Sequence, residues 1–149
     1  MINKYKWDGY FVFRVNGKVQ KIIKNTISSL AIIELAKPLI GTSPDLEIKY
    51  LAVGTDATAP TTADTTLGTE SFRCLYEART NPSTGRHEHT FTIDTTEAVV
   101  HIKELGIFGG AGATASADSG TLISRVLLDW DKQNDEELAF TRIDIVGRG

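Results

Sequence analysis

Apolar and polar residues alternate along much of the chain with a period of two, the spacing of a β-strand with one buried face. Residues 10–15 are rich in aromatic and β-branched side chains and predict a strand. Asn16 and Gly17 follow directly, and this pair is the strongest short signal for a type I′ hairpin turn. Residues 18–24 therefore predict the partner strand, and residues 1–9 are expected to form an N-terminal arm.

Six further segments carry strand patterns and are separated by turn residues. They are residues 47–53, 70–79, 87–94, 98–108, 121–130 and 137–146. The apolar positions change parity between Ile102 and Leu105, which predicts a β-bulge or a switch of edge. A similar change separates Phe140 from Ile143. About eight strands with regular turns predict an antiparallel β-sandwich or β-barrel.

One segment shows a helical period instead. Residues 28–37 carry apolar side chains at helical spacing, and Asn25 or Thr26 is expected to cap the helix. Pro38 is expected to end it, because the residue before a proline is pushed out of the α region. The apolar residues cover much of the circumference of this short helix, so we expect it to pack on a sheet.

Two long segments, 55–68 and 109–120, are rich in small and polar residues and have no period. The first is too long for an ordinary hairpin loop, and a flexible linker is one interpretation. We favour an ordered surface loop, because Asp and Thr side chains can bond nearby backbone N–H groups, with Leu67 packed inward. The residues expected to define this loop are Thr55, Asp56, Pro60, Asp64 and Leu67.

The composition fits one globular domain over residues 1–149, with 41% hydrophobic and 23% charged residues. A net charge of -3 argues against a nucleic-acid partner, which usually selects a basic excess. The longest apolar stretch, residues 30–39, is interrupted by Glu34 and Lys37, so we expect no membrane partner. Threonine is the unusual residue, since eight of the 18 lie between Thr42 and Thr69.

Three histidines are the only candidates for metal chemistry. His87 and His89 lie two apart on a predicted strand and would project from the same face, with His101 as a third candidate ligand. Polar residues at the start of a strand are the simpler interpretation, and we expect neither a metal nor another cofactor. Cys74 has no second cysteine and no obvious catalytic base near it in sequence, and no serine-nucleophile or phosphate-binding motif is present. The sequence therefore predicts a protein that is not an enzyme, and a small hydrolase is the least favoured alternative.

Three aromatic residues gather near the N-terminus: Tyr5, Trp7 and Tyr10. They can pin the expected arm onto the body of the same chain. They can equally anchor it on a neighbouring subunit, because aromatic side chains are frequent at interface hot spots. The pattern leaves both interpretations open.

Three separated segments carry motifs that are recognisable together. Residues 48–73 contain an apolar strand, Gly-Thr, an Ala-Pro pair, then Asp-Thr-Thr-Leu-Gly-Thr-Glu and an Arg. Residues 103–110 contain Glu-Leu-Gly-Ile-Phe, and residues 120–125 read Gly-Thr-Leu-Ile-Ser-Arg. In this order the three segments resemble a family of small structural proteins of tailed bacteriophages, and the resemblance covers about residues 15–146.

This resemblance implies a virion component without catalytic residues. The N-terminal segment has no apolar stretch typical of a secretory signal, so we expect synthesis in the host cytoplasm. The resemblance also implies self-assembly into a homo-oligomer, such as a trimer or a ring, and docking to other virion proteins. A tail location, in a fibre, baseplate or collar, is the main expectation. A capsid decoration or head fibre is the first alternative, and a carbohydrate-binding module that recognises a host-surface glycan is the second.

Overall fold

The computed structural model describes residues 4–148. It is mainly β, with 54% strand and 8% helix. Over these residues it has nine strands, one α-helix and one 3-10 helix. In chain order the elements are β1 (Tyr5–Val15), β2 (Lys18–Ile27), α1 (Ser29–Ala36), η1 (Lys37–Ile40), β3 (Ile48–Gly54), β4 (Glu70–Leu75), β5 (Ala78–Ser83), β6 (Arg86–Ile93), β7 (His101–Gly109), β8 (Thr121–Asp131) and β9 (Leu138–Arg148).

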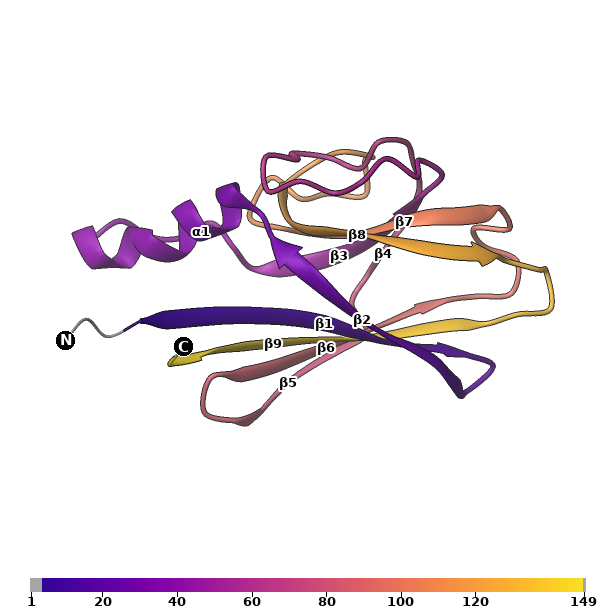
Figure 1. Ribbon diagram of the computed structural model, residues 1–149, viewed down its shortest axis with the longest axis horizontal. Helices are drawn as coiled ribbons and strands as arrows, with labels where there is room; N and C mark the ends of the chain where they lie inside the picture. The colour runs from indigo at the N-terminus through magenta and orange to yellow at the C-terminus, as the bar shows by residue number, and fades with distance from the viewer. Residues whose placement is uncertain (1–3, 149) are drawn as a thin grey trace.

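The nine strands described form one antiparallel sheet in the order β4-β3-β7-β8-β2-β1-β9-β6-β5. The sheet curls over so that β3, β4, β7 and β8 form one layer and β1, β9, β6 and β5 form the other (Figure 1). β2 joins the layers, because it pairs with β1 along most of its length and with β8 only at Thr26 and Ile27. The result is a half-barrel, which confirms the predicted antiparallel β class.

The core lies between the two layers and draws apolar side chains from both. Phe11, Phe91 and Phe140 enter from one layer, and Leu51 and Ile107 enter from the other, all at most 1% exposed. Aromatic contacts also cross the space, since Phe13 of β1 lies edge-on to Trp130 of β8 with 5.3 Å between ring centroids. Burial of this shared core holds the layers together.

Two local predictions are confirmed. Asn16 and Gly17 have φ values of 47° and 80°, as the type I′ turn between β1 and β2 requires. The pairing of β7 with β8 shifts register between Ile102 and Glu104, as the change of parity predicts. Both features are specified by residues adjacent in sequence, which is why the sequence pattern predicts them.

The predicted strand 70–79 is wrong in one respect, because it is two strands. β4 pairs with β3, and β5 pairs with β6 at the opposite edge of the sheet. Tyr76 and Glu77 make the crossing, and their backbone N–H groups donate to Lys49 in one layer and to Thr90 in the other. The apolar alternation continues through the crossing, so the pattern does not reveal the break.

The expected N-terminal arm is also wrong for the residues described. Residues 5–9 belong to β1 and pair with β9, with Tyr5 opposite Arg148 and Gly9 opposite Asp144. Residues 1–3 of the predicted arm lie outside the described residues. Pairing with β9 satisfies the backbone of this segment, so it continues the sheet.

The helix departs from expectation at its start and in its packing. It begins after Ser28, whose Oγ accepts from the N–H of Ala31 at 3.1 Å, whereas Asn25 and Thr26 belong to β2. The α-helix ends at Ala36, with Lys37 as its C-cap directly before Pro38, as predicted, but the chain continues as the 3-10 helix η1, near whose start the missing N–H of Pro38 costs nothing. Ala31 is the one buried residue of α1, and the helix projects beyond the sheets (Figure 1).

Candidate functional site

The threonine-rich loop, residues 55–69 between β3 and β4, is an ordered excursion over the outside of one layer (Figure 1). Its two ends meet, because Thr55 N–H donates to the carbonyl of Thr69 at 3.0 Å. Leu67 is 3% exposed and packs with Ala52, Phe108 and Leu122. Leu67 is therefore the apolar anchor that the sequence predicts.

A buried carboxylate accepts hydrogen bonds from the backbone of this loop. Glu104 of β7 is fully buried, and its carboxylate accepts from the N–H groups of Asp56, Gly68 and Thr69 at 3.2, 2.8 and 2.7 Å. The same carboxylate accepts from Nε of Arg125 at 2.7 Å. Four donors thus surround one buried negative charge, which compensates the cost of removing it from water.

The guanidinium of Arg125 binds the other side of the threonine-rich loop. It donates to the carbonyls of Thr58 and Asp56 at 2.8 and 3.3 Å and lies 3.5 Å from the carboxylate of Asp64. The side chain is 4% exposed, so these contacts replace its hydration. Glu104 and Arg125 together hold the N–H groups and the carbonyls of a segment that has little apolar surface of its own.

Two short turns inside the loop complete its order. Oδ1 of Asp56 accepts from the N–H and the hydroxyl of Thr58, and the carboxylate of Asp64 accepts from both groups of Thr61. The Thr58 hydrogen bonds hold the pKa of Asp56 below its usual value. Burial acts to raise the pKa of Asp64, but the Thr61 hydrogen bonds and the charge of Arg125 outweigh it and lower that pKa. These are the Asp–Thr turns that the sequence predicts.

A second ion pair holds the glycine-rich loop, residues 110–120. Arg73 and Glu70 of β4 pair at 2.7 Å with side chains only 3% and 2% exposed. Arg73 donates to the carbonyls of Thr114 and Ser119, and its guanidinium lies 4.5 Å from the Phe108 ring centroid. Both long loops are therefore held from below by a buried arginine paired with a glutamate.

The four charged residues of these two pairs all come from the segments that resemble the phage family. Sequence reasoning recognised the segments but did not predict the pairs. Glu104 and Arg125 each interrupt an otherwise apolar strand, and that interruption is the signal that could have revealed them. Their pairing brings together residues 21 positions apart, which only the alignment of β7 beside β8 determines.

A third buried cluster involves one of the N-terminal aromatic residues. Asp144 of β9 accepts from Trp7 Nε1 at 2.9 Å and pairs with Arg142 at 2.8 Å. Arg142 is fully buried and also donates to the Ser124 hydroxyl at 2.9 Å. The parity change in β9 comes from these inward-facing charges, because the pairing of β9 with β1 has no register shift.

The three N-terminal aromatic residues therefore have different surroundings. Trp7 is pinned to its own chain through Asp144, which is the first of the two interpretations left open. Tyr10 is half-buried in β1, opposite Ile143. Tyr5 is 76% exposed at the beginning of the same strand, so its ring is accessible to a partner.

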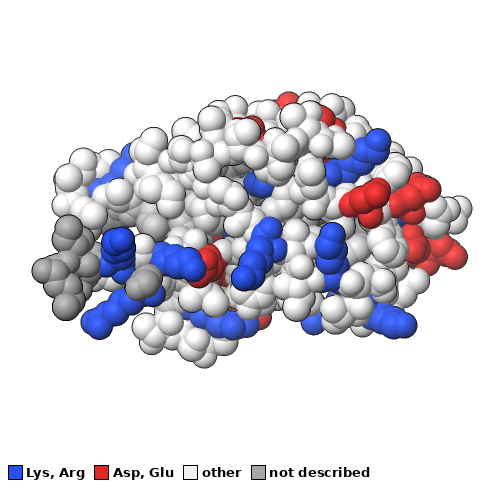
Figure 2. Space-filling view, viewed as in Figure 1, with Lys and Arg blue, Asp and Glu red and all other residues white. Residues whose placement is uncertain are grey.

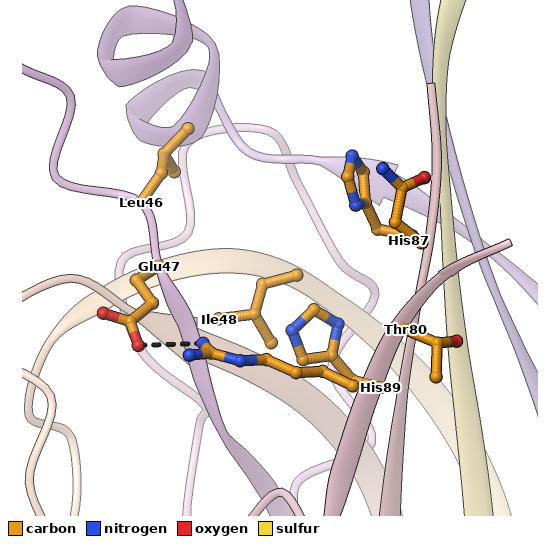
Figure 3. A pocket seen from close by; sticks show the side chains of 8 residues that line it. Leu46, Glu47, Ile48, Thr80, His87 and His89 are labelled. Carbon is orange, nitrogen blue, oxygen red and sulfur yellow. Dashed lines mark hydrogen bonds and ion pairs between the residues drawn. The ribbon is translucent and has the colours of Figure 1, made fainter. Parts of the chain in front are cut away.

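His87 and His89 line one side of an open hollow of about 440 Å³ between β6 and the start of β3 (Figure 3). Leu46, Glu47 and Ile48 form the facing wall, and Glu47 pairs with Arg79 at 3.0 Å. His89 is 8% exposed, and its Nδ1 has no hydrogen-bond partner among residues 4–148. Burial lowers its pKa and outweighs the opposing attraction of Asp144, so the ring favours the neutral form.

The three-histidine arrangement considered from the sequence does not form. His101 lies on β7, in the other layer, and its ring bonds to Asp129 of β8. Within residues 4–148, no three His, Cys, Asp or Glu side chains lie close enough together to hold a metal ion. His87 and His89 thus share a hollow without a third ligand.

None of the helices in the described part of the chain has the length and apolarity to cross a membrane. Comparisons with protein families, curated proteins and solved structures find no match to this chain. The resemblance to tailed-phage structural proteins therefore rests on the three sequence segments, and what it implies is taken up as a proposal.

Proposed function

We propose that this protein is a non-enzymatic structural component of a tailed-bacteriophage virion, associated with the tail as part of a fibre, baseplate or collar. The observation that supports the proposal is the use of the three phage-like segments in the fold. Their charged residues form the buried pairs Glu104–Arg125 and Glu70–Arg73, each of which holds one long loop. A structural role for these residues fits their surroundings, because their polar atoms form hydrogen bonds with other groups of the same chain.

The fold has properties that a particle component needs. The chain has one cysteine, so its order cannot come from an internal disulfide. Buried ion pairs and a shared two-layer core supply the order instead, and they hold long loops in one shape on the surface. A surface with a fixed shape can form the same contact many times in a symmetric assembly, at little entropic cost for each contact.

The proposal is tested by locating the protein in particles of the phage that encodes it. Purified virions are separated into heads and tails, and the peptides of each fraction are quantified by mass spectrometry. We expect this chain in the tail fraction, at a fixed ratio to the other tail proteins. Recovery with heads supports the capsid-decoration alternative, and absence from both fractions contradicts a virion role.

A further inference from the structure

The hollow between β6 and the start of β3 has the size and the lining of a small-molecule site. Its volume of about 440 Å³ lies within the roughly 300–1,000 Å³ that is typical of such sites. Leu46 and Ile48 give one wall an apolar surface, and His87 and His89 stand on the opposite wall (Figure 3). An apolar surface that faces a few fixed polar groups is the usual lining of a ligand site.

His89 is the polar side chain in this hollow that the fold leaves incompletely bonded. It is 8% exposed, its ring projects from β6 into the hollow, and its Nδ1 has no hydrogen-bond partner within the described part of the chain. Buried polar atoms are normally hydrogen-bonded, so an unpartnered one at the wall of a cavity indicates a ligand group that completes it. Burial lowers the pKa of His89, and in the neutral ring one nitrogen donates and the other accepts. A hydroxyl group can pair with either nitrogen, because it both donates and accepts.

The two charges that line the hollow neutralise each other. Glu47 precedes β3 and Arg79 lies on β5, so their 3.0 Å ion pair joins the two sides of the hollow (dashed line in Figure 3). The Arg79 guanidinium also lies 4.8 Å from the Tyr76 ring centroid, which holds it in place. A ligand carboxylate would compete with Glu47 for Arg79, and a ligand ammonium would compete with Arg79 for Glu47. The hollow therefore favours an uncharged ligand, which can bond to both groups without separating them.

Neighbouring charges do not change this preference. Figure 2 shows Lys and Arg at several places on the molecule, including the end that carries the chain termini, and Asp and Glu mainly at the opposite end. The two arginines on the strands that border the hollow, Arg79 of β5 and Arg86 of β6, both have counter-ions, since Arg86 lies 3.5 Å from the carboxylate of Glu88. Neither arginine is therefore free to hold an anion in the hollow.

An uncharged ring that carries several hydroxyl groups meets all of these conditions. Its hydroxyls can bond to the His89 ring and to the free edges of the Glu47–Arg79 pair, and its C–H face can lie against Leu46 and Ile48. We propose that this hollow binds one sugar ring, with His89 as the central hydrogen-bonding group. A free sugar and the terminal unit of a longer glycan present the same chemistry. The inference goes beyond the proposed function and does not depend on it, because a structural part of a tail needs no small-molecule site.

The experiment titrates the ¹⁵N-labelled full-length chain with D-glucose, D-galactose and N-acetyl-D-glucosamine, and follows the imidazole ¹⁵N signals by NMR. We expect at least one sugar to shift the His89 signals to saturation. The His101 signals are expected to stay in place, because that ring lies in the other layer beside Asp129. His89→Leu is expected to raise the dissociation constant of that sugar, read from backbone amide signals, roughly tenfold, the effect of one lost hydrogen bond. His101→Leu is the matched control and is expected to leave the constant unchanged.

Circular dichroism verifies that both variants are folded, and the wild-type titration tests the inference on its own. Wild-type His89 signals that none of the sugars shifts overturn it. Sugar binding that His89→Leu leaves at full strength also overturns it, as does a response to acetate, methylammonium or glycerol that equals the response to the sugars. The disaccharide that ends in the bound sugar then separates the two sources, since tighter binding assigns the site to a glycan chain and weaker binding to a free sugar.

The two proposals fail separately. A protein found in tails that binds no sugar contradicts only this inference, whereas a sugar-binding protein absent from particles contradicts only the virion role.

Discussion

At the scale of single residues, this protein buries charge to hold loops that lack apolar side chains. Glu104 and Arg125 are the clearest case, because one carboxylate and one guanidinium bind both sides of the threonine-rich loop. Removing one partner of a buried ion pair destabilises the fold more than replacing both partners by apolar residues, because the remaining charge stays buried without its counter-ion. The two partners are therefore expected to be sensitive to substitution one at a time.

Glu104→Gln is expected to lower the free energy of unfolding by about 3 kcal/mol, because it removes the buried counter-ion of Arg125 at 2.7 Å and leaves only the partly exposed Asp64 at 3.5 Å. Urea denaturation followed by circular dichroism measures this loss. Arg79→Met is the control, since its pair with Glu47 is half-exposed and is worth about 0–1 kcal/mol. Equal losses in the two variants would mean that the buried pair does not support the fold.

His89 is expected to make stability decrease as pH falls below about 6.5, the usual histidine pKa. Its pKa is lower in the folded protein, owing to burial, so the unfolded chain binds the proton first and gains stability. The slope is at most about 1.4 kcal/mol per pH unit. Thermal unfolding from pH 7 to pH 5 measures it, and His89→Leu is expected to flatten the curve there.

His87→Leu is the matched control for this pH dependence, because His87 lies two residues away on β6 and is exposed. It is expected to keep the wild-type slope. A slope that persists in His89→Leu would assign the effect to other groups. Asp56 and Asp64 are separable, since their lowered pKa values act only below about pH 4.

At the scale of elements, local signals predict turns and bulges well and predict the placement of α1 poorly. The Asn16–Gly17 turn and the β7 bulge depend on residues adjacent in sequence. The packing of α1 depends on whether the rest of the fold provides a surface for it. The sequence pattern of an apolar helix is the same whether or not such a surface exists in the same chain. The cap was missed for a similar reason, because β2 continues through Asn25 and Thr26.

Ser28→Ala is expected to loosen α1, because the hydroxyl caps the helix and also donates to the carbonyl of Leu122. Loss of an N-cap costs about 1–2 kcal/mol, which corresponds to a roughly 5- to 30-fold faster amide exchange. Hydrogen exchange of residues 29–36 measures the effect. Ser29→Ala is the control, since that side chain is exposed and has no capping role. Unchanged exchange in Ser28→Ala would show that the cap does not hold the helix.

At the scale of the whole molecule, the mainly β antiparallel class follows from the period of two, whereas the path of the chain does not. The crossing at Tyr76 and Glu77 lies inside an unbroken alternation, so eight strands were expected where the described residues have nine. The buried pairs join residues far apart in sequence, and only the complete sheet brings them together. The candidate site was therefore predictable as the loop with Leu67 inward, but not as the charges that hold it.

The two layers are expected to unfold as one unit, because their side chains form one core. Trp7 on β1 and Trp130 on β8 report on different layers, so Trp7→Phe and Trp130→Phe each leave one reporter. In both variants the fluorescence midpoint in urea is expected to coincide with the circular dichroism midpoint. Separate midpoints in either variant would show that each layer is stable without the other.

The pairing of β1 with β9 has a mechanical consequence. Tyr5 is opposite Arg148, so the two ends of the described chain leave from neighbouring strands at one end of the molecule (Figure 1). A force applied to both ends would peel these strands apart one hydrogen bond at a time, which is the weakest direction of a β-sheet. The direct link between β4 and β5 joins opposite edges of the same sheet and lies outside that path. An assembly that places this protein under tension would therefore hold it more securely through contacts on its surfaces than through attachments at its two ends.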